Sequence, residues 1–180
     1  MILLIQLCKE PFHIFEFVKP IQDILNTINV EFVSKNYKEL SKKLLSQADK
    51  IIICGTSLKD NSFLQDVQDF AWIKHYHKPL LGICGGMHLL GLVYHGKIQQ
   101  KQEIGLTQIE WTKEFFGMVG KKEVYELHKY VVTSSEFEIQ ATSLQCPQAI
   151  KHKHKPLYGV LFHPEVRNKE LIKHFVKTTN

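Results

Sequence analysis

The sequence has no long apolar run and few cysteines. None of its hydrophobic stretches approaches the ~20 residues that a membrane-spanning helix needs. The apolar segment at residues 1–7 is too short for the core of a signal peptide with its flanks. The four cysteines, Cys8, Cys54, Cys84 and Cys146, match neither the spacing of a zinc site nor that of a disulfide framework. We therefore expect a cytoplasmic protein with reduced thiols and no membrane partner.

Charge of one sign is not concentrated anywhere either. The net charge is +5, and the lysines that produce it are scattered along the chain. The densest basic stretch, residues 151–155, lacks the interleaved aromatics of a nucleic-acid-binding face, so we expect no nucleic-acid partner. His152 and His154 alternate within it, but no cysteine or carboxylate stands at ligand spacing, and we expect no metal site.

The 180 residues are 44% hydrophobic, which is enough for one domain over residues 1–180 with a full core. Apolar runs alternate with segments of helical periodicity in the first half, and this alternation predicts an α/β fold with an open, mostly parallel sheet and helices on both faces. A smaller antiparallel portion is expected in the second half. We predict strands at 2–7, 30–33, 50–54, 80–83, 105–112, 123–133, 137–142, 149–153 and 157–162, and helices at 12–28, 37–48, 62–75, 86–94 and 170–177.

The most informative stretch is residues 79–91, in which an apolar strand leads into Gly82-x-Cys84-x-Gly86 and then into a helix. This pattern is that of a nucleophile elbow with cysteine at its apex. Small residues two places before and after the apex allow a sharp, strained turn. The thiol then lies at a helix N-terminus, which favours the thiolate, and the N–H of Gly85 is free to bind an oxyanion. A glycine-rich turn around a structural cysteine is the alternative interpretation.

A second signal lies near the other end of the chain, where an apolar strand runs into His163-Pro164-Glu165. Residues i and i+2 of an extended segment point the same way, and Pro164 keeps the segment out of a helix. His163 and Glu165 therefore project together. A cysteine and a histidine oriented by a carboxylate form the usual arrangement of a nucleophilic triad, with Cys84, His163 and Glu165 as the candidate catalytic residues.

The elbow and the His-Pro-Glu segment together resemble the class I (triad) glutamine amidotransferases, whose fold is flavodoxin-like. The segment from Cys146 to Val166 is similar to the closing hairpin of that family, and the resemblance is greatest to the amidotransferase subunit of GMP synthase. It implies hydrolysis of glutamine through a cysteine thioester, without a cofactor. It also implies a synthetase subunit that acts in trans and uses the ammonia.

The resemblance also implies a set of oxyanion- and substrate-binding residues. Gly55 and Thr56 follow the third strand where the family typically has Gly-Gly-Pro, and Gly85 supplies the other oxyanion donor. His88 replaces the family's glutamine four residues after the nucleophile. His128 matches the histidine of a segment that couples the GMP synthase subunit to its synthetase, although the residues around it differ.

These departures leave three functions open. The first is an active glutaminase that supplies ammonia to a synthetase. The second is a hydrolase of another γ-glutamyl amide, which would tolerate His88. The third is a degenerate, non-catalytic binding or regulatory subunit, which Thr56, His88, Leu127 and Tyr130 favour and the intact triad opposes.

Overall fold

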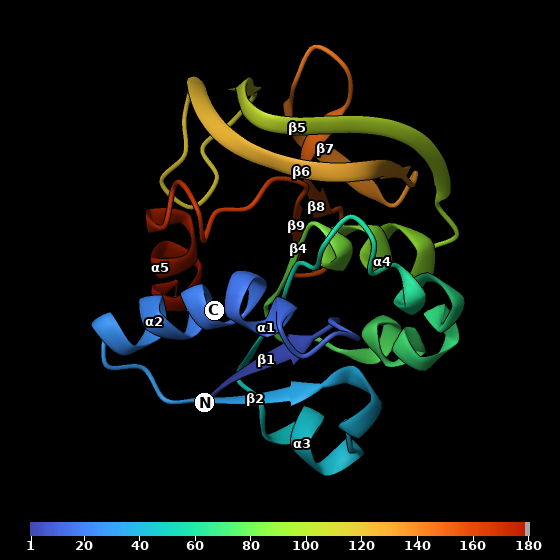
Figure 1. The fold of residues 1–180 in the computed structure, drawn as a ribbon, viewed down its shortest axis with the longest axis vertical. Helices are drawn as coiled ribbons and strands as arrows, with labels where there is room; N and C mark the ends of the chain where they lie inside the picture. Colours follow the sequence, from blue (N-terminus) through green and yellow to red (C-terminus); the bar gives the residue numbers. More distant parts are fainter. Residues whose placement is uncertain (179–180) are drawn as a thin grey trace.

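The apolar runs of the chain form the centre of one nine-stranded sheet, which the computed structural model describes over residues 1–178 (Figure 1). Five strands are parallel and lie in the order β2-β1-β3-β4-β9. Their bounds are β1 (Ile2–Gln6), β2 (Phe32–Asn36), β3 (Lys50–Ile53), β4 (Leu80–Ile83) and β9 (Leu157–Val160). The last of these comes from the end of the chain and pairs with β4, so it brings the C-terminal segment beside the centre of the first half.

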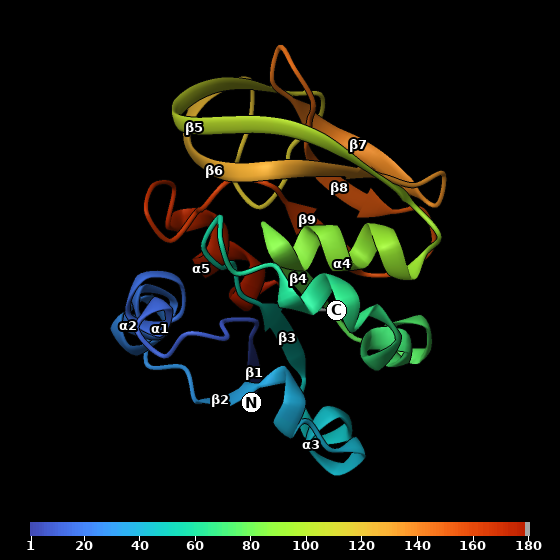
Figure 2. The same ribbon diagram turned by 45° about the vertical axis from the view of Figure 1, so that its right-hand side comes forward.

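The sheet continues beyond β9 as an antiparallel portion in the order β8-β7-β5-β6. These strands are β5 (Lys97–Trp111), β6 (Lys121–Thr133), β7 (Phe137–Thr142) and β8 (Pro147–His152). The long hairpin of β5 and β6 curves over the end of β4 and the start of α4 (Figures 1 and 2). Because β6 is the last strand of the sheet, one of its edges has no neighbouring strand.

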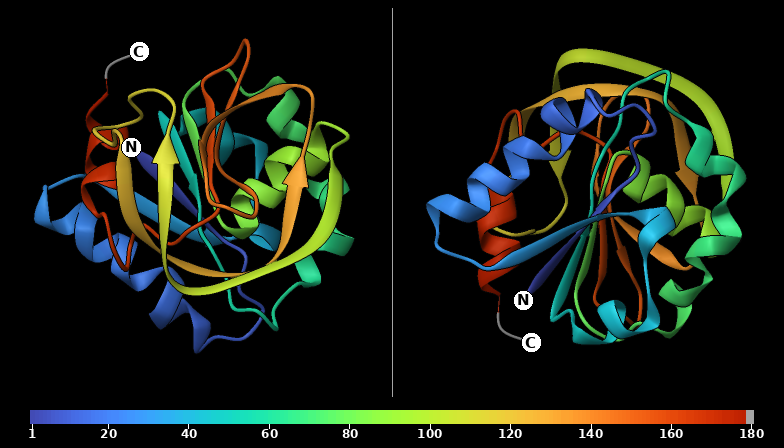
Figure 3. Two further views of the ribbon diagram at one scale, coloured as in Figure 1. Left: turned by 90° about the horizontal axis from the view of Figure 1, so that it is seen from above. Right: turned by 60° about the horizontal axis from the view of Figure 1, so that its bottom comes forward.

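Helices cover both faces of the parallel strands, as the apolar strand sequences predict. In the right-hand view of Figure 3 the strands run between the two helical layers. One layer contains α1 (His13–Phe17), α2 (Lys19–Thr27) and α5 (Glu170–Lys177). The other contains α3 (Lys42–Gln47), α4 (Gly85–Val93) and the short 3₁₀ helices η1 (Tyr37–Glu39), η2 (Ser62–Gln65) and η3 (Val67–His75).

Alternate residues of a strand pack against the two helical layers. In β1, Ile2 and Leu4 are buried against the α1–α2–α5 layer, whereas Leu3 and Ile5 are buried against the opposite layer. This two-sided burial explains why the strand is apolar throughout. Within residues 1–178 the structure contains no helix with the length and apolar character needed to cross a membrane.

The fold class is confirmed, while several element boundaries differ from the prediction. The helix expected at 12–28 is divided at Val18, just before Pro20, because proline fits the first turn of a helix and not its interior. The segment 62–75 is 3₁₀ instead of α-helix. The strand expected at 30–33 begins at Phe32, and that expected at 105–112 already begins at Lys97.

Candidate active site

Cys84 lies at the apex of the turn between β4 and α4. Its backbone has φ +47° and ψ −101°, a strained conformation for a residue with a Cβ. The two flanking glycines are required by close approach. A Cβ on Gly82 would lie 2.5 Å from the carbonyl oxygen of Gly86, and one on Gly86 would lie 2.5 Å from that of Ile53. The turn predicted from the glycine spacing is therefore present, with the sulfur at the N-terminus of α4.

His163 and Glu165 occupy the turn that follows β9, and both are almost completely buried. The Nδ1 of His163 donates to Glu165 Oε1 over 2.7 Å. The other ring nitrogen, Nε2, has no hydrogen-bond partner among the described residues and is free to act on a neighbouring group. Burial lowers the pKa of His163, but the charges of Glu165 and Cys84 outweigh burial and raise it well above its ordinary value. The ring of Phe17 packs 5.3 Å from the imidazole and shields it.

The backbone of Gly55 lies between the side chains of His163 and Cys84. A Cβ at this position would lie 2.6 Å from His163 Cε1 and 3.5 Å from the Cβ of Cys84, so the glycine backbone fits between the two side chains. The parallel pairing β3-β4-β9 explains this convergence, since the ends of the three adjacent strands meet at one edge. The structure thus brings together Cys84, His163, Glu165 and Gly55.

Two of the residues predicted to supply oxyanion donors, Gly85 and Thr56, lie beside Cys84. Gly85 is the first residue of α4, so its N–H has no carbonyl four residues earlier within the helix. Thr56 is buried beside it, and its hydroxyl has no hydrogen-bond partner among the described residues. Both residues line the hollow next to Cys84.

The unpaired edge of β6 covers this hollow. The carbonyl oxygen of Tyr125 accepts from the backbone N–H of His163 over 2.9 Å, and that of Leu127 accepts from the Cys84 thiol over 3.7 Å. The hollow measures about 10 Å³, which is room for roughly one water molecule. A substrate the size of an amino acid therefore requires β6 or the loop after Gly55 to move.

His88 projects from α4 into the wall of the same hollow. Its Nε2 lies 2.8 Å from the carbonyl oxygen of Tyr130 and must donate, because a carbonyl only accepts. Burial, with further contributions from nearby histidines, lowers the pKa of His88 to about 4, so the ring is neutral at physiological pH. The Nδ1 lone pair is then the group of this ring that can accept a hydrogen bond.

His128 also lines the hollow, although its ring nitrogens are directed at other groups. The Nδ1 atom lies 3.1 Å from the carbonyl oxygen of Lys101, and Nε2 lies 3.2 Å from Glu103 Oε2. The role predicted for His128 in binding the substrate stays a prediction.

The backbone carbonyls of Leu127 and Tyr130 and the ring of Phe17 are components of the site that the sequence did not indicate. A carbonyl group is present at every residue and carries no sequence signal. Its position here follows from the bare edge of β6, which only the strand order reveals.

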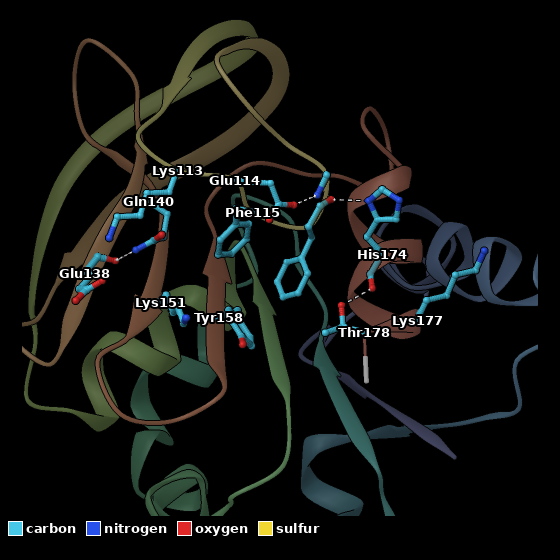
Figure 4. Close-up of a pocket in the computed structure, with 12 residues that line it drawn as sticks. Lys113, Glu114, Phe115, Glu138, Gln140, Lys151, Tyr158, His174, Lys177 and Thr178 are labelled. Atoms are coloured by element: carbon cyan, nitrogen blue, oxygen red, sulfur yellow. Dashed lines mark hydrogen bonds between the residues drawn. The ribbon is translucent and has the colours of Figure 1, made fainter. Parts of the chain in front are cut away.

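A larger hollow of about 590 Å³ lies elsewhere, between α5 and the segment that joins β5 to β6 (Figure 4). Lys113, Lys151, Phe115, Tyr158 and His174 are among the side chains that line it. Cys84, His163 and Glu165 do not belong to its lining. The candidate chemistry therefore belongs to the smaller hollow, where a nucleophile, a base and its carboxylate meet.

The chain resembles known proteins in both sequence and structure. It is 39% identical over 107 residues to a glutamine-hydrolyzing GMP synthase subunit of Methanobrevibacter smithii, covering 54% of this chain and 55% of that protein. Against the corresponding GMP synthase subunit of Pyrococcus furiosus, the identity is 36% over 120 residues, or 58% of this chain and 64% of the relative. The chain thus spans less than two thirds of the length of these relatives.

Solved structures share the fold over nearly the whole chain. A putative GMP synthase subunit from Thermoplasma acidophilum superposes with a TM-score of 0.84 at 20% identity, over 97% of this chain and 91% of that one. A glutamine amidotransferase from Thermotoga maritima gives a TM-score of 0.74 at 19% identity, over 98% and 81%. The family model "Glutamine amidotransferase class-I" matches residues 16–179. The chain belongs to the class I glutamine amidotransferase family, and the resemblance seen in its elbow and its His-Pro-Glu segment is confirmed.

Proposed function

We propose that this protein hydrolyses the side-chain amide of glutamine to glutamate and ammonia through a thioester on Cys84. The observation that carries the proposal is the strained cysteine at the head of α4, close to an imidazole that a buried carboxylate holds by Nδ1. This arrangement leaves Nε2 of His163 free to exchange a proton with the sulfur and the leaving group. The matched family and the names of its relatives support the same chemistry.

In the proposed reaction the sulfur of Cys84 attacks the carboxamide carbon. His163 takes the thiol proton and transfers it to the departing ammonia, while Glu165 fixes the imidazole tautomer and stabilises its charged form. The N–H groups of Gly85 and of Gly55 or Thr56 receive the oxyanion. Water then cleaves the thioester, with His163 acting as the base.

A synthetase subunit is the proposed recipient of the ammonia. Relatives at 36–39% identity are named as subunits of a glutamine-hydrolysing GMP synthase, which supports a role in purine biosynthesis. A cytoplasmic location is part of the same proposal. The closed hollow beside Cys84 adds a structural reason for such a partner. A protein that displaces β6 from Cys84 would open the site and couple hydrolysis to the use of ammonia.

His88 favours a second candidate, the hydrolysis of another γ-glutamyl amide. Its neutral ring donates to Tyr130 and offers only an acceptor to the ligand, whereas an amide side chain offers both a donor and an acceptor. If the amide is needed to bind free glutamine, His88→Gln will raise kcat/KM on glutamine by roughly ten- to a hundredfold, the value of one hydrogen bond to a charged group.

The test is glutamate and ammonia release from glutamine and from a panel of γ-glutamyl amides, with and without an added GMP synthetase subunit. Wild type should release the two products in equal amounts, and Cys84→Ser should abolish release. A glutamine-analogue affinity label should attach to Cys84. Absence of turnover on every amide, even with the synthetase subunit present, would leave only a non-catalytic binding role.

A further inference from the structure

Three potential metal ligands lie close together where β5, β6 and the start of β8 meet, and none of them belongs to the proposed catalytic triad. Glu103 of β5, His128 of β6 and Cys146, which precedes β8, each place one ligand atom within 4.8 Å of the other two. Glu103 Oε2 lies 3.2 Å from His128 Nε2 and 3.1 Å from Cys146 Sγ. All three residues are buried.

The ring of His128 is held in the orientation that a metal ligand needs. Its Nδ1 lies 3.1 Å from the carbonyl oxygen of Lys101, and since a carbonyl only accepts, Nδ1 carries the hydrogen. In the neutral ring, Nε2 therefore presents a lone pair toward Glu103. Two electron-rich atoms facing each other at 3.2 Å require a cation between them, either a proton or a metal ion.

A fourth residue, Glu126, lies beside this pair. Glu126 is fully buried, its Oε2 lies 3.3 Å from His128 Nε2, and neither of its carboxylate oxygens has a hydrogen-bond partner among the described residues. A buried carboxylate without a hydrogen-bond partner needs a ligand of its own, and a cation bound by the neighbouring Glu103, His128 and Cys146 would supply one.

Local structure explains how the cluster forms. A β-bulge between Gln100 and Glu103 interrupts the pairing of β5 with β6, and the pairing resumes with Glu103 opposite His128. Gln148 completes the surroundings. Its amide nitrogen lies 2.6 Å from Glu103 Oε2 and 3.5 Å from Cys146 Sγ, so it can donate to both when they bind a cation.

We propose that Glu103, His128 and Cys146 bind a structural zinc ion. Glu126 lies beside this group of three, 3.3 Å from His128 Nε2, and would complete the site as the fourth ligand by turning its carboxylate toward the ion. Zinc accepts one thiolate, one imidazole and carboxylates in a tetrahedron, whereas Mg²⁺ and Ca²⁺ prefer oxygen alone. Zinc–ligand lengths give tetrahedron edges of roughly 3.4 Å between O and N and 3.6 Å between O and S. The observed separations are 3.2 Å and 3.1 Å, so the sulfur would have to move about 0.5 Å away from the carboxylate when the ion binds. His128 lines the hollow beside Cys84, but the zinc site shares no residue with the triad of Cys84, His163 and Glu165 and does not depend on glutamine being the substrate.

Zinc at this site would tie β5, β6 and the start of β8 together. Leu127 lies between the ligands Glu126 and His128, and its carbonyl oxygen holds the Cys84 thiol. The metal would thus fix the part of β6 that covers Cys84.

The first experiment measures zinc in the full chain after expression in zinc-supplemented medium. Wild type should purify with about one zinc per chain, as a closed four-ligand site predicts. Cys146→Ser should lower zinc affinity at least roughly a hundredfold, and Glu126→Gln by about ten- to a hundredfold. His152→Gln removes a different buried histidine and Cys8→Ser a different buried thiol, so both should keep the zinc.

A second measurement does not depend on how well the variants fold. Titration of metal-free wild type with Co²⁺ should produce a sulfur-to-cobalt charge-transfer band and tetrahedral ligand-field bands. Cys84→Ser should give the same spectrum, and Cys146→Ser, checked for folding by circular dichroism, should lose the band. Wild type that takes up neither zinc nor cobalt, or a band that disappears in Cys84→Ser and persists in Cys146→Ser, would overturn the proposal.

Discussion

The thiol of Cys84 donates to the carbonyl oxygen of Leu127 over 3.7 Å, so the nucleophile is bound to the bare edge of the last strand of the sheet. The neighbouring Tyr125 carbonyl binds the backbone of His163 in the same way. One strand edge thus holds both the nucleophile and its proposed base. Access to the site and the position of β6 are therefore linked.

We predict that Cys84 is the most reactive of the four thiols. Burial raises the pKa of Cys8 to about 11, that of Cys146 to about 12, and that of Cys54 well above its ordinary value. Cys8 and Cys54 remain protonated at pH 7.5, and Cys146 is either protonated or bound to the proposed zinc ion. All three should react slowly, because the free thiolate is the nucleophile. Iodoacetamide labelling followed by peptide mass spectrometry should find Cys84 modified first. Faster modification of Cys8, Cys54 or Cys146 would contradict the assignment.

Glu165→Gln should reduce kcat/KM by roughly 10²–10⁴-fold, the usual contribution of an oriented acid–base group. The amide cannot supply the negative charge that favours the imidazolium, so the pKa of His163 should fall toward or below its ordinary value. The raised pKa stabilises the fold below about pH 6.5, and this contribution disappears as the pH rises through the folded-state pKa. Glu165→Gln should therefore flatten the loss of stability at alkaline pH.

The pKa of His163 is measurable by NMR titration of its ring protons, and stability by urea unfolding at several pH values. Glu170→Gln is the matched control, because Glu170 is an exposed residue of α5 that pairs with Lys173. If Glu165→Gln leaves the His163 titration unchanged, Glu165 does not set the charge of the imidazole.

Gly55→Ala should reduce kcat/KM by about a hundredfold, since displacement of a catalytic group by about 1 Å can have this effect. The added methyl would lie 2.6 Å from His163 Cε1, and the hydrogen bond from Nδ1 to Glu165 restrains the ring from moving away. Gly120→Ala is the control: its φ is +61°, so alanine is strained there, but no atom lies within 4 Å of the new Cβ. Equal losses of activity in the two variants would mean that Gly55 acts through general stability.

Much of the architecture was predictable because it follows from short-range patterns. The apolar runs of β1, β3 and β4 are buried on both faces, and continuous burial produces a sequence signal that is easy to recognise. The elbow at Cys84 was predictable for a different reason. Gly82 and Gly86 touch backbone atoms so closely that no side chain fits, and such a constraint is visible as a glycine pattern.

The hairpin and the buried cluster were not predictable in the same way. The early part of β5 is polar and mostly exposed, so its strand pairing leaves no alternating apolar pattern. Glu103, His128 and Cys146 are distant in sequence, and only the pairing register of β5 with β6 and the return of β8 bring them together. Spacing rules for metal sites recognise ligands on one local element and cannot detect a site assembled from two strands and the residue before a third.

His88→Gln should remove a specific loss of stability in acid. In the folded protein the pKa of His88 is lowered to about 4, mainly by burial, against an ordinary value of 6.5. Below pH 6.5 the unfolded chain binds a proton at this residue while the folded chain does not, so stability falls as the pH decreases toward 4. At pH 5 this amounts to about 2 kcal/mol relative to pH 7.5, from about 1.4 kcal/mol per pH unit.

Urea unfolding of wild type and His88→Gln at pH 7.5 and pH 5 measures this contribution, because other titrating groups are common to both proteins. Glutamine can also donate to the Tyr130 carbonyl, so the variant should fold at both pH values. The exposed His75 provides the control, and His75→Gln should keep the full acid sensitivity of wild type. If His88→Gln loses as much stability between pH 7.5 and pH 5 as wild type, then His88 binds a proton in the folded state. Its ring would then donate from both nitrogens, and it could no longer accept a hydrogen bond from a substrate ammonium group.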